Sequence, residues 1–201
     1  EYIVYPNVSL GPNFTISSGN IIDMTGFVIP TNDRLVLGIL NSKLIDFLMK
    51  QWAIGRRGGY QEYRVQYIEK IPIPKISQNM TTSIKESVDK ILILSKEIHI
   101  IKKNFIEDLE ILIEGKIISK KILNIDKLSF VDFMIEVNRL SKKRILRDKQ
   151  NLLRDDFEHI GKSILEKKHM IKNLEKNIDK MIFQSYGLSK NQIDYIENYL
   201  N

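Results

Sequence analysis

The spacing of hydrophobic residues changes near residue 77. Before this point, short β-prone runs alternate with clusters of Gly, Asn, Pro and Ser, which is typical of strands joined by turns. All five prolines lie in this part, whereas after it apolar residues recur in steps of three and four, as in amphipathic helices. The sequence therefore predicts an α+β fold, with a small, mixed β-rich domain at residues 1–77 and a helical spacer or docking region at residues 78–201. Strands are expected at residues 2–5, 14–16, 21–22 and 26–29.

Helices are predicted in both parts. One amphipathic helix interrupts the β-rich part, with capping candidates at 31–33 and an apolar face that continues to Trp52. In the second part, two long apolar stripes predict helices that pack together as a hairpin or bundle. The first stripe contains Ile84, Val88, Ile91, Leu94, Ile98, Ile101, Phe105, Leu109 and Leu112, and the second contains Phe157, Ile160, Ile164, Ile171, Leu174, Ile178 and Ile182.

Shorter helical signals complete the second part. A helical segment is expected at about residues 128–147, between the two long helices. The last long helix is expected to end at Tyr186-Gly187, with the glycine in the left-handed conformation that favours helix termination. Ser189 and Gln192 have the spacing of a capping box, which predicts a final helix up to Leu200.

Composition narrows the class of protein. The chain has 201 residues, of which 43% are hydrophobic and 28% charged, a composition typical of soluble globular proteins. It has no cysteine, which excludes disulfides, thiolate metal sites and cysteine nucleophiles. No apolar run has the length of a membrane span, and the start lacks the features of a signal peptide. We therefore expect part of a longer, cytoplasmic protein. The net charge of +6 is compatible with a polyanionic partner.

Catalytic signals are weak. Asp156 and the run Glu166-Lys167-Lys168 superficially offer the acids and lysine of a nuclease, but they lie in a strongly helical stretch and are expected on a solvated helix face. The histidines, at 99, 159 and 169, lack the spacing of a helical metal site. The chain also lacks a phosphate-binding loop, Asn-Pro-Pro-Tyr, and the Phe-x-Gly-x-Gly of a methyl-donor site. We expect the chain itself to be non-catalytic and to hold neither metal nor cofactor.

A basic and aromatic stretch at 50–70 is the candidate binding site. Arginine can contact a guanine edge or a phosphate, glutamine can pair with adenine, and tyrosine can contact phosphate or sugar. Two glycines let the backbone approach a phosphate closely. The predicted DNA-binding residues are Arg56, Arg57, Gly58, Gly59, Tyr60, Gln61, Tyr63, Arg64 and Gln66. In the competing interpretation, the glycines form a hairpin turn, the arginines are solvated and the tyrosines are half-buried.

Three motifs occur in a familiar order. They are Leu-Gly-Ile-Leu-Asn-Ser-Lys-Leu-Ile-Asp-Phe at 37–47, Arg-Gly-Gly-Tyr at 57–60 and Tyr-Ile-Glu-Lys-Ile-Pro-Ile-Pro at 67–74. Together they resemble the TaqI-like carboxy-terminal specificity domain of type IIG and related restriction–modification enzymes. The opening strands and the Tyr-Gly-Leu at 186–188 are also similar to that family.

The resemblance implies sequence-specific recognition of double-stranded DNA. It further implies a separate amino-terminal domain of the same protein, an S-adenosylmethionine-dependent adenine-N6 methyltransferase with or without nuclease activity, into which the target adenine flips. By the same resemblance, the helix at 37–47 is scaffold and the prolines at 72 and 74 end the recognition fold. The alternative is a helical docking module, such as a fragment of a separate specificity subunit, which holds partner subunits through the two apolar stripes.

Overall fold

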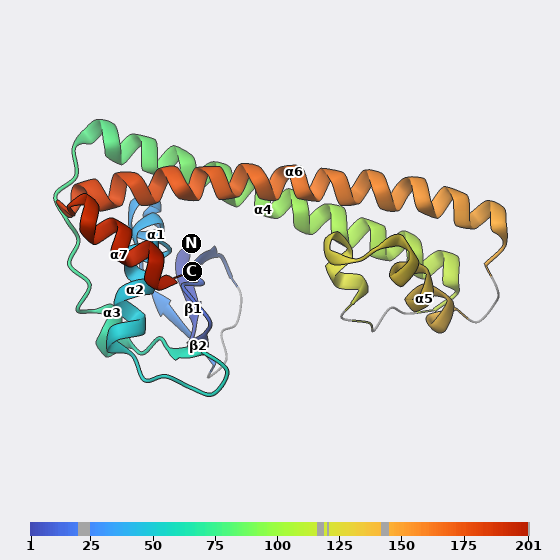
Figure 1. Cartoon of the computed structure of the whole chain (residues 1–201), viewed down its shortest axis with the longest axis horizontal. Coiled ribbons are helices and arrows are strands. Elements are labelled where there is room, and N and C mark those ends of the chain that lie inside the picture. The colour runs from blue at the N-terminus through green and yellow to red at the C-terminus, as the bar shows by residue number, and fades with distance from the viewer. Residues whose placement is uncertain (20–24, 116–118, 120, 142–144, 201) are drawn as a thin grey trace. The chain divides into compact units, whose positions relative to one another are not determined.

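The fold is α+β, as the hydrophobic pattern predicts (Figure 1). The computed structural model describes residues 1–19, 25–115, 119, 121–141 and 145–200. The chain divides into two compact units, of which unit 1 comprises Glu1–Lys90 with Asn173–Asn201 and unit 2 comprises Ile91–Lys172. The division near residue 77, which rests on a change of sequence pattern, stays a prediction.

Unit 1 begins with short antiparallel strands. β1 (Tyr2–Pro6) lies between β3 (Thr15–Ser17) and β4 (Gly26–Ile29), while β2 (Val8–Ser9) pairs with β5 (Gln61–Glu62). In the first sheet, Ile3 is opposite Ile16 and Ile29. The strands expected at 2–5, 14–16 and 26–29 are therefore confirmed to within a residue, whereas β2 and β5 were not expected. The strand predicted at 21–22 falls outside the described residues.

The prediction of a single helix between residues 31 and 52 is wrong, because the structure has two helices there, α1 (Arg34–Leu40) and α2 (Lys43–Trp52). Asn41 ends α1 and binds Phe14 from both directions: its amide nitrogen donates to the Phe14 carbonyl at 2.9 Å, and its Oδ1 accepts from the Phe14 N–H at 3.0 Å. Ser42 then starts α2, since its Oγ accepts from the Ile45 N–H. Side-chain capping by such residues competes with helix continuation.

The two long helices and the final helix expected in the second part are confirmed, whereas the segment expected at about 128–147 is helical only at 130–140. The 3₁₀ helix η1 and the four-residue helix α3 were not expected. The helices that follow α2 are α3 (Val65–Ile68), α4 (Gln78–Ile113), η1 (Ile122–Lys127), α5 (Phe130–Leu140), α6 (Arg147–Ser185) and α7 (Lys190–Leu200). At the end of α6, Gly187 has a φ of 68°, and Ser189 and Gln192 form the predicted capping box, with the Ser189 N–H donating to Gln192 Oε1 at 2.8 Å. In the part of the chain that the structure describes, no helix is both long and apolar enough to cross a membrane.

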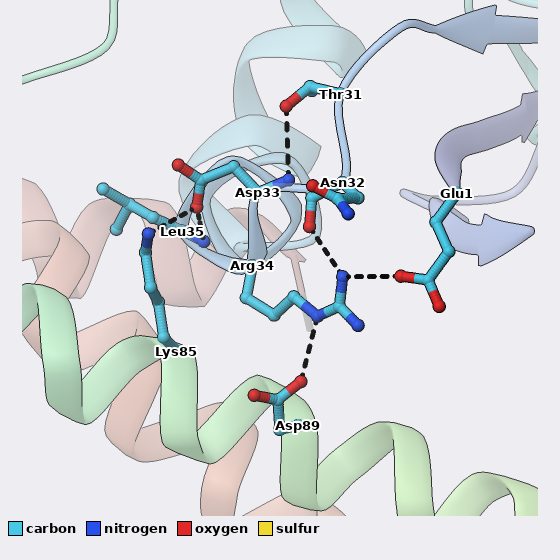
Figure 2. Close-up of polar contacts among 8 residues, drawn as sticks. All are labelled: Glu1, Thr31, Asn32, Asp33, Arg34, Leu35, Lys85 and Asp89. Carbon is cyan, nitrogen blue, oxygen red and sulfur yellow. Dashed lines mark hydrogen bonds and ion pairs between the residues drawn. The ribbon is translucent and has the colours of Figure 1, made fainter.

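Polar contacts fix the start of α1 against α4 within unit 1 (Figure 2). Asp33 caps α1 and also pairs with Lys85 of α4 at 3.0 Å. The next residue, Arg34, donates from Nε to Asp89 of α4 at 3.0 Å and from Nη1 to Glu1 at 3.1 Å. The chain start, α1 and α4 are thus held together by charge pairs around one helix terminus.

Both apolar stripes run through the two units and contribute buried residues to each. In unit 2, the Phe133 ring contacts Phe105 and Phe157, with centroids 5.7 and 4.8 Å away, and Ile164 of α6 is fully buried in the same cluster. In unit 1, Gly38 of α1 faces α4 and α6. A Cβ atom at Gly38 would lie 3.0 Å from Ile84, 3.1 Å from Val88 and 3.8 Å from Ile178.

Helix α7 and the end of α6 cover α2. The Phe47 ring contacts Tyr195 and Tyr199 edge-on, with centroids 5.9 and 5.3 Å away. Asp179 of α6 accepts the backbone N–H of Lys43 at 2.8 Å, at the first turn of α2. Burial raises the pKa of Asp179 to about 6, although the Lys43 N–H and charge act in the opposite direction.

We expect Gly38→Val to lower the free energy of unfolding by about 1–3 kcal/mol, because the new side chain would overlap Ile84 and Val88. Gly161→Ala in the interior of α6 is the matched control. Its Cβ would meet nothing within 4 Å, so the better helix propensity of alanine should raise stability by about 0.5–1 kcal/mol. Urea unfolding measures both changes. Equal stability of the Gly38→Val variant and the original chain would contradict this packing.

Asp179→Asn should change the pH dependence of stability. The folded chain holds the Asp179 proton up to about pH 6, whereas the unfolded chain releases it near its ordinary value of 3.8. The folded state therefore binds more protons between these values, and Asp179 makes the free energy of unfolding rise as pH falls through this window. The amide of asparagine still accepts the Lys43 N–H but does not titrate. Urea unfolding at several pH values should show a stability difference between the two proteins that varies across this window, and a constant difference would contradict the argument.

Candidate functional site

The basic stretch folds into a tight turn, here called the arginine hairpin (residues 54–62). Gly55 pairs with Gln61, the Arg56 N–H donates to the Tyr60 carbonyl at 2.6 Å, and the Glu62 N–H donates to the Ile54 carbonyl at 3.1 Å. Gly58 and Gly59 both have a φ of 82°, a left-handed conformation that residues with a side chain rarely adopt. The two glycines thus make the reversal possible, as in the competing interpretation of the sequence.

The arginine hairpin is anchored to the first strands. Its end, β5, pairs with β2 so that Glu62 is opposite Val8. Immediately afterwards, the Tyr63 N–H donates to the Asn7 carbonyl at 2.7 Å. The backbone hydrogen bonds of β5 and of Tyr63 to the first strands therefore fix where the turn lies within unit 1.

Glu62 binds two arginines from a buried position. Its side chain is only 3% exposed, Oε1 accepts from Nε and pairs with Nη2 of Arg56, and Oε2 pairs with Nε of Arg64 at 2.5 Å. Burial raises the pKa of Glu62, but hydrogen bonds and charge from Arg56 and Arg64 outweigh it, so the pKa of this carboxyl is lowered overall. The glutamate remains an anion that holds both guanidinium groups in place.

The other predicted contacts lie on the surface. Arg57 and Tyr60 are exposed at the tip of the arginine hairpin, and Gln66 is exposed on α3. Arg57 has no ion pair or hydrogen bond to its guanidinium among the residues that the structure describes. Gln61 is partly buried in β5. The structure therefore brings free and glutamate-bound arginines together on one short segment.

Tyr63 differs from the other predicted contact residues. Its side chain is 1% exposed, and its ring packs edge-on against Phe14 with centroids 6.0 Å apart. Its hydroxyl has no hydrogen-bond partner among the described protein groups. Burial, and after it the charge of Asp46, raises the pKa of the Tyr63 hydroxyl. In this conformation the ring belongs to the core, so it holds the arginine hairpin in place and does not present a binding group to solvent.

Glu62 was not among the residues that the sequence pattern predicted for the site. The available signal was the alternation Glu62-Tyr63-Arg64, which in an extended chain places the acid and arginine on one side and the aromatic ring on the other. The hairpin adds Arg56 to the same glutamate across the turn.

The candidate nuclease residues do not form a site. Asp156 and Glu166 are both exposed on α6, and ten residues of helix separate them by about 15 Å along the axis. Lys167 pairs with Glu97 at 2.5 Å, and Lys168 pairs with Asp126. Within the described part of the chain, no cluster of three His, Asp or Glu residues could hold a metal.

Each part of the chain matches a known family model. Residues 2–73 match the TaqI-like C-terminal specificity domain, and residues 77–182 match a family described as Domain of unknown function (DUF8810). The second match covers more than half of the chain, which therefore belongs to that family, and the first part is similar to a TaqI-like specificity domain. Neither the curated proteins nor the solved structures gave a match. The expected resemblance is thus confirmed, and the first match contains the whole arginine hairpin.

Tyr63→Phe and Tyr63→Ala should separate the structural role of this residue from a binding role. Removing an unpaired buried hydroxyl should leave stability unchanged or slightly higher, whereas removing the ring should cost about 3–5 kcal/mol. Tyr60→Ala is the exposed control and should change stability by less than about 0.5 kcal/mol. Thermal unfolding measures all three variants. A strongly destabilised Tyr63→Phe variant would show that the hydroxyl has a partner.

Proposed function

We propose that this chain recognises a short sequence in double-stranded DNA, as the specificity domain of a restriction–modification enzyme. The observation that carries the proposal is the arginine hairpin: a glycine turn, fixed by backbone hydrogen bonds, exposes Arg56 and Arg57 within the segment that matches a specificity domain. Base edges in the major groove offer the hydrogen-bond acceptors that arginine contacts.

Charge supports a nucleic acid as the partner. The chain carries a net charge of +6, and on the hairpin and the adjoining turn Arg56, Arg57 and Arg64 outnumber the one buried acid, Glu62. Exposed arginines can neutralise phosphates and release their counterions, and flanking aromatic groups such as Tyr60 can pack on sugars. The expected result is salt-dependent binding to duplex DNA.

The chemistry of the parent enzyme would reside in another domain. By the family resemblance, we propose a cytoplasmic protein in which an amino-terminal S-adenosylmethionine-dependent domain methylates adenine at N6, while this chain grips the DNA. The glycine pair of the arginine hairpin does not fit the methyl donor. Gly58 and Gly59 form a hairpin turn between extended segments, whereas a donor-binding glycine loop connects a strand to a helix.

The docking alternative receives less support. It requires the two apolar stripes to be available to partner subunits. Residues such as Ile84, Leu109, Ile164 and Ile182 are at most 1% exposed and pack inside their own units. The stripes therefore stabilise this chain.

The proposal is tested by binding of the 201-residue chain and its Arg56→Ala/Arg57→Ala variant to a random-sequence duplex pool at two salt concentrations. The original chain should bind in a salt-dependent manner and enrich a short motif. The variant should bind more weakly, and each lost phosphate contact should reduce the slope of log affinity against log salt by roughly one unit.

Arg147→Ala/Lys149→Ala provides the matched control, because it removes the same charge from exposed positions on α6 in unit 2. This variant should retain the enriched motif. If the original chain fails to bind duplex DNA at low salt, or if both variants lose binding equally, DNA recognition by the arginine hairpin is wrong.

A further inference from the structure

The shared glutamate divides the arginines of the site into different chemical roles. Arg56 and Arg64 are both bound by Glu62, whereas Arg57 at the tip has no partner among the described residues. An exposed, unpaired arginine suits a phosphate, which accepts hydrogen bonds from many directions. A base edge requires a guanidinium group held at a defined angle.

The donor atoms that remain free distinguish the two bound arginines. In Arg56, both Nε and Nη2 contact the same oxygen of Glu62, so these two donors of the guanidinium group are already occupied. Arg64 uses only Nε, at 2.5 Å from the other oxygen, and its side chain is 46% exposed. Its two terminal nitrogens therefore remain available as a planar fork. That fork matches the O6 and N7 acceptors of guanine.

The surroundings of Arg64 also limit the positions that its guanidinium group can reach. Arg64 is the N-cap residue of α3 and directly follows Tyr63, which is buried in the core. Its backbone is thus fixed next to the packed ring. Glu62 is 3% exposed and cannot itself reach a base, so it does not act as an acceptor for cytosine.

We propose that Arg64 reads a guanine in the recognised sequence and that Glu62 is the positioning residue that orients it, while Arg57 contacts phosphate. This inference rests on the proposed function, since it assigns roles within a DNA-binding site. Glu62 also offsets one of the positive charges of Arg56 and Arg64. It therefore limits non-specific attraction to phosphates at the point where sequence is read.

The test is motif enrichment from a random duplex pool by the 201-residue chain and by its Glu62→Gln and Arg64→Lys variants. The original chain should enrich a motif that contains a guanine. Both variants should lose the preference at that position by about 5- to 150-fold, the range expected for one bidentate base contact. Glu62→Gln should in addition steepen the salt dependence by roughly one unit, because an offsetting charge is lost. A purely structural role for Glu62 would not produce that increase.

Circular dichroism and thermal unfolding show whether each variant is folded. If Glu62→Gln does not fold, Arg64→Lys decides, because it keeps the positive charge and removes only the planar fork. Arg147→Ala/Lys149→Ala is the control and should keep the guanine preference. A motif without guanine, or a guanine preference that survives in the folded variants, overturns the assignment of Arg64 and leaves DNA recognition intact. Failure of the original chain to bind duplex DNA overturns the proposed function, and this inference with it.

Discussion

The missing side chain at Gly38 allows α1 to lie directly against Ile84 and Val88 of α4 and near Ile178 of α6. The contacts at the start of α1 depend on this approach, because Asp33 and Arg34 reach Lys85 and Asp89 only when the helices are close. From α1 the chain passes through Asn41, which binds the loop before β3, and into α2, which supports the arginine hairpin through the buried core. One glycine thus determines how closely the strand-bearing segment packs on the long helices of unit 1.

Buried carboxylates recur at the points where segments meet. Glu62 joins Arg56 to Arg64, and Asp126 in unit 2 joins Lys102 of α4 to Lys168 of α6. Burial raises the pKa of Asp126, but the two lysines outweigh this effect and lower its pKa to about 2. A buried acid with two cationic partners remains ionised and contacts both of them, and removing the acid would leave two neighbouring cations without their shared anion. The same arrangement therefore orders a surface hairpin in one unit and a helix cluster in the other.

The sequence predicted the long helices well because their signal is local. The three–four spacing of apolar residues, the glycine at 187 and the Ser189–Gln192 capping box each specify structure within a few positions. The break at Asn41 was missed because it depends on Phe14, which is distant in the sequence. The site was only partly predictable for the same reason. Arginines and glycines are visible as composition, but the burial of Tyr63 and the pairing of Glu62 across the turn require the folded hairpin.

Unit 1 is discontinuous in the sequence, since Asn173–Asn201 completes a unit that begins with the strands. During synthesis, the strands and the arginine hairpin leave the ribosome well before the segment that carries Asp179 and α7. At typical rates of 5–20 residues per second, translation of the intervening unit 2 takes roughly 4–16 s. For that interval α2 lacks its contacts with Tyr195, Tyr199 and Asp179, and its apolar face is open to solvent. Folding of the first part is therefore completed only after the last helices emerge.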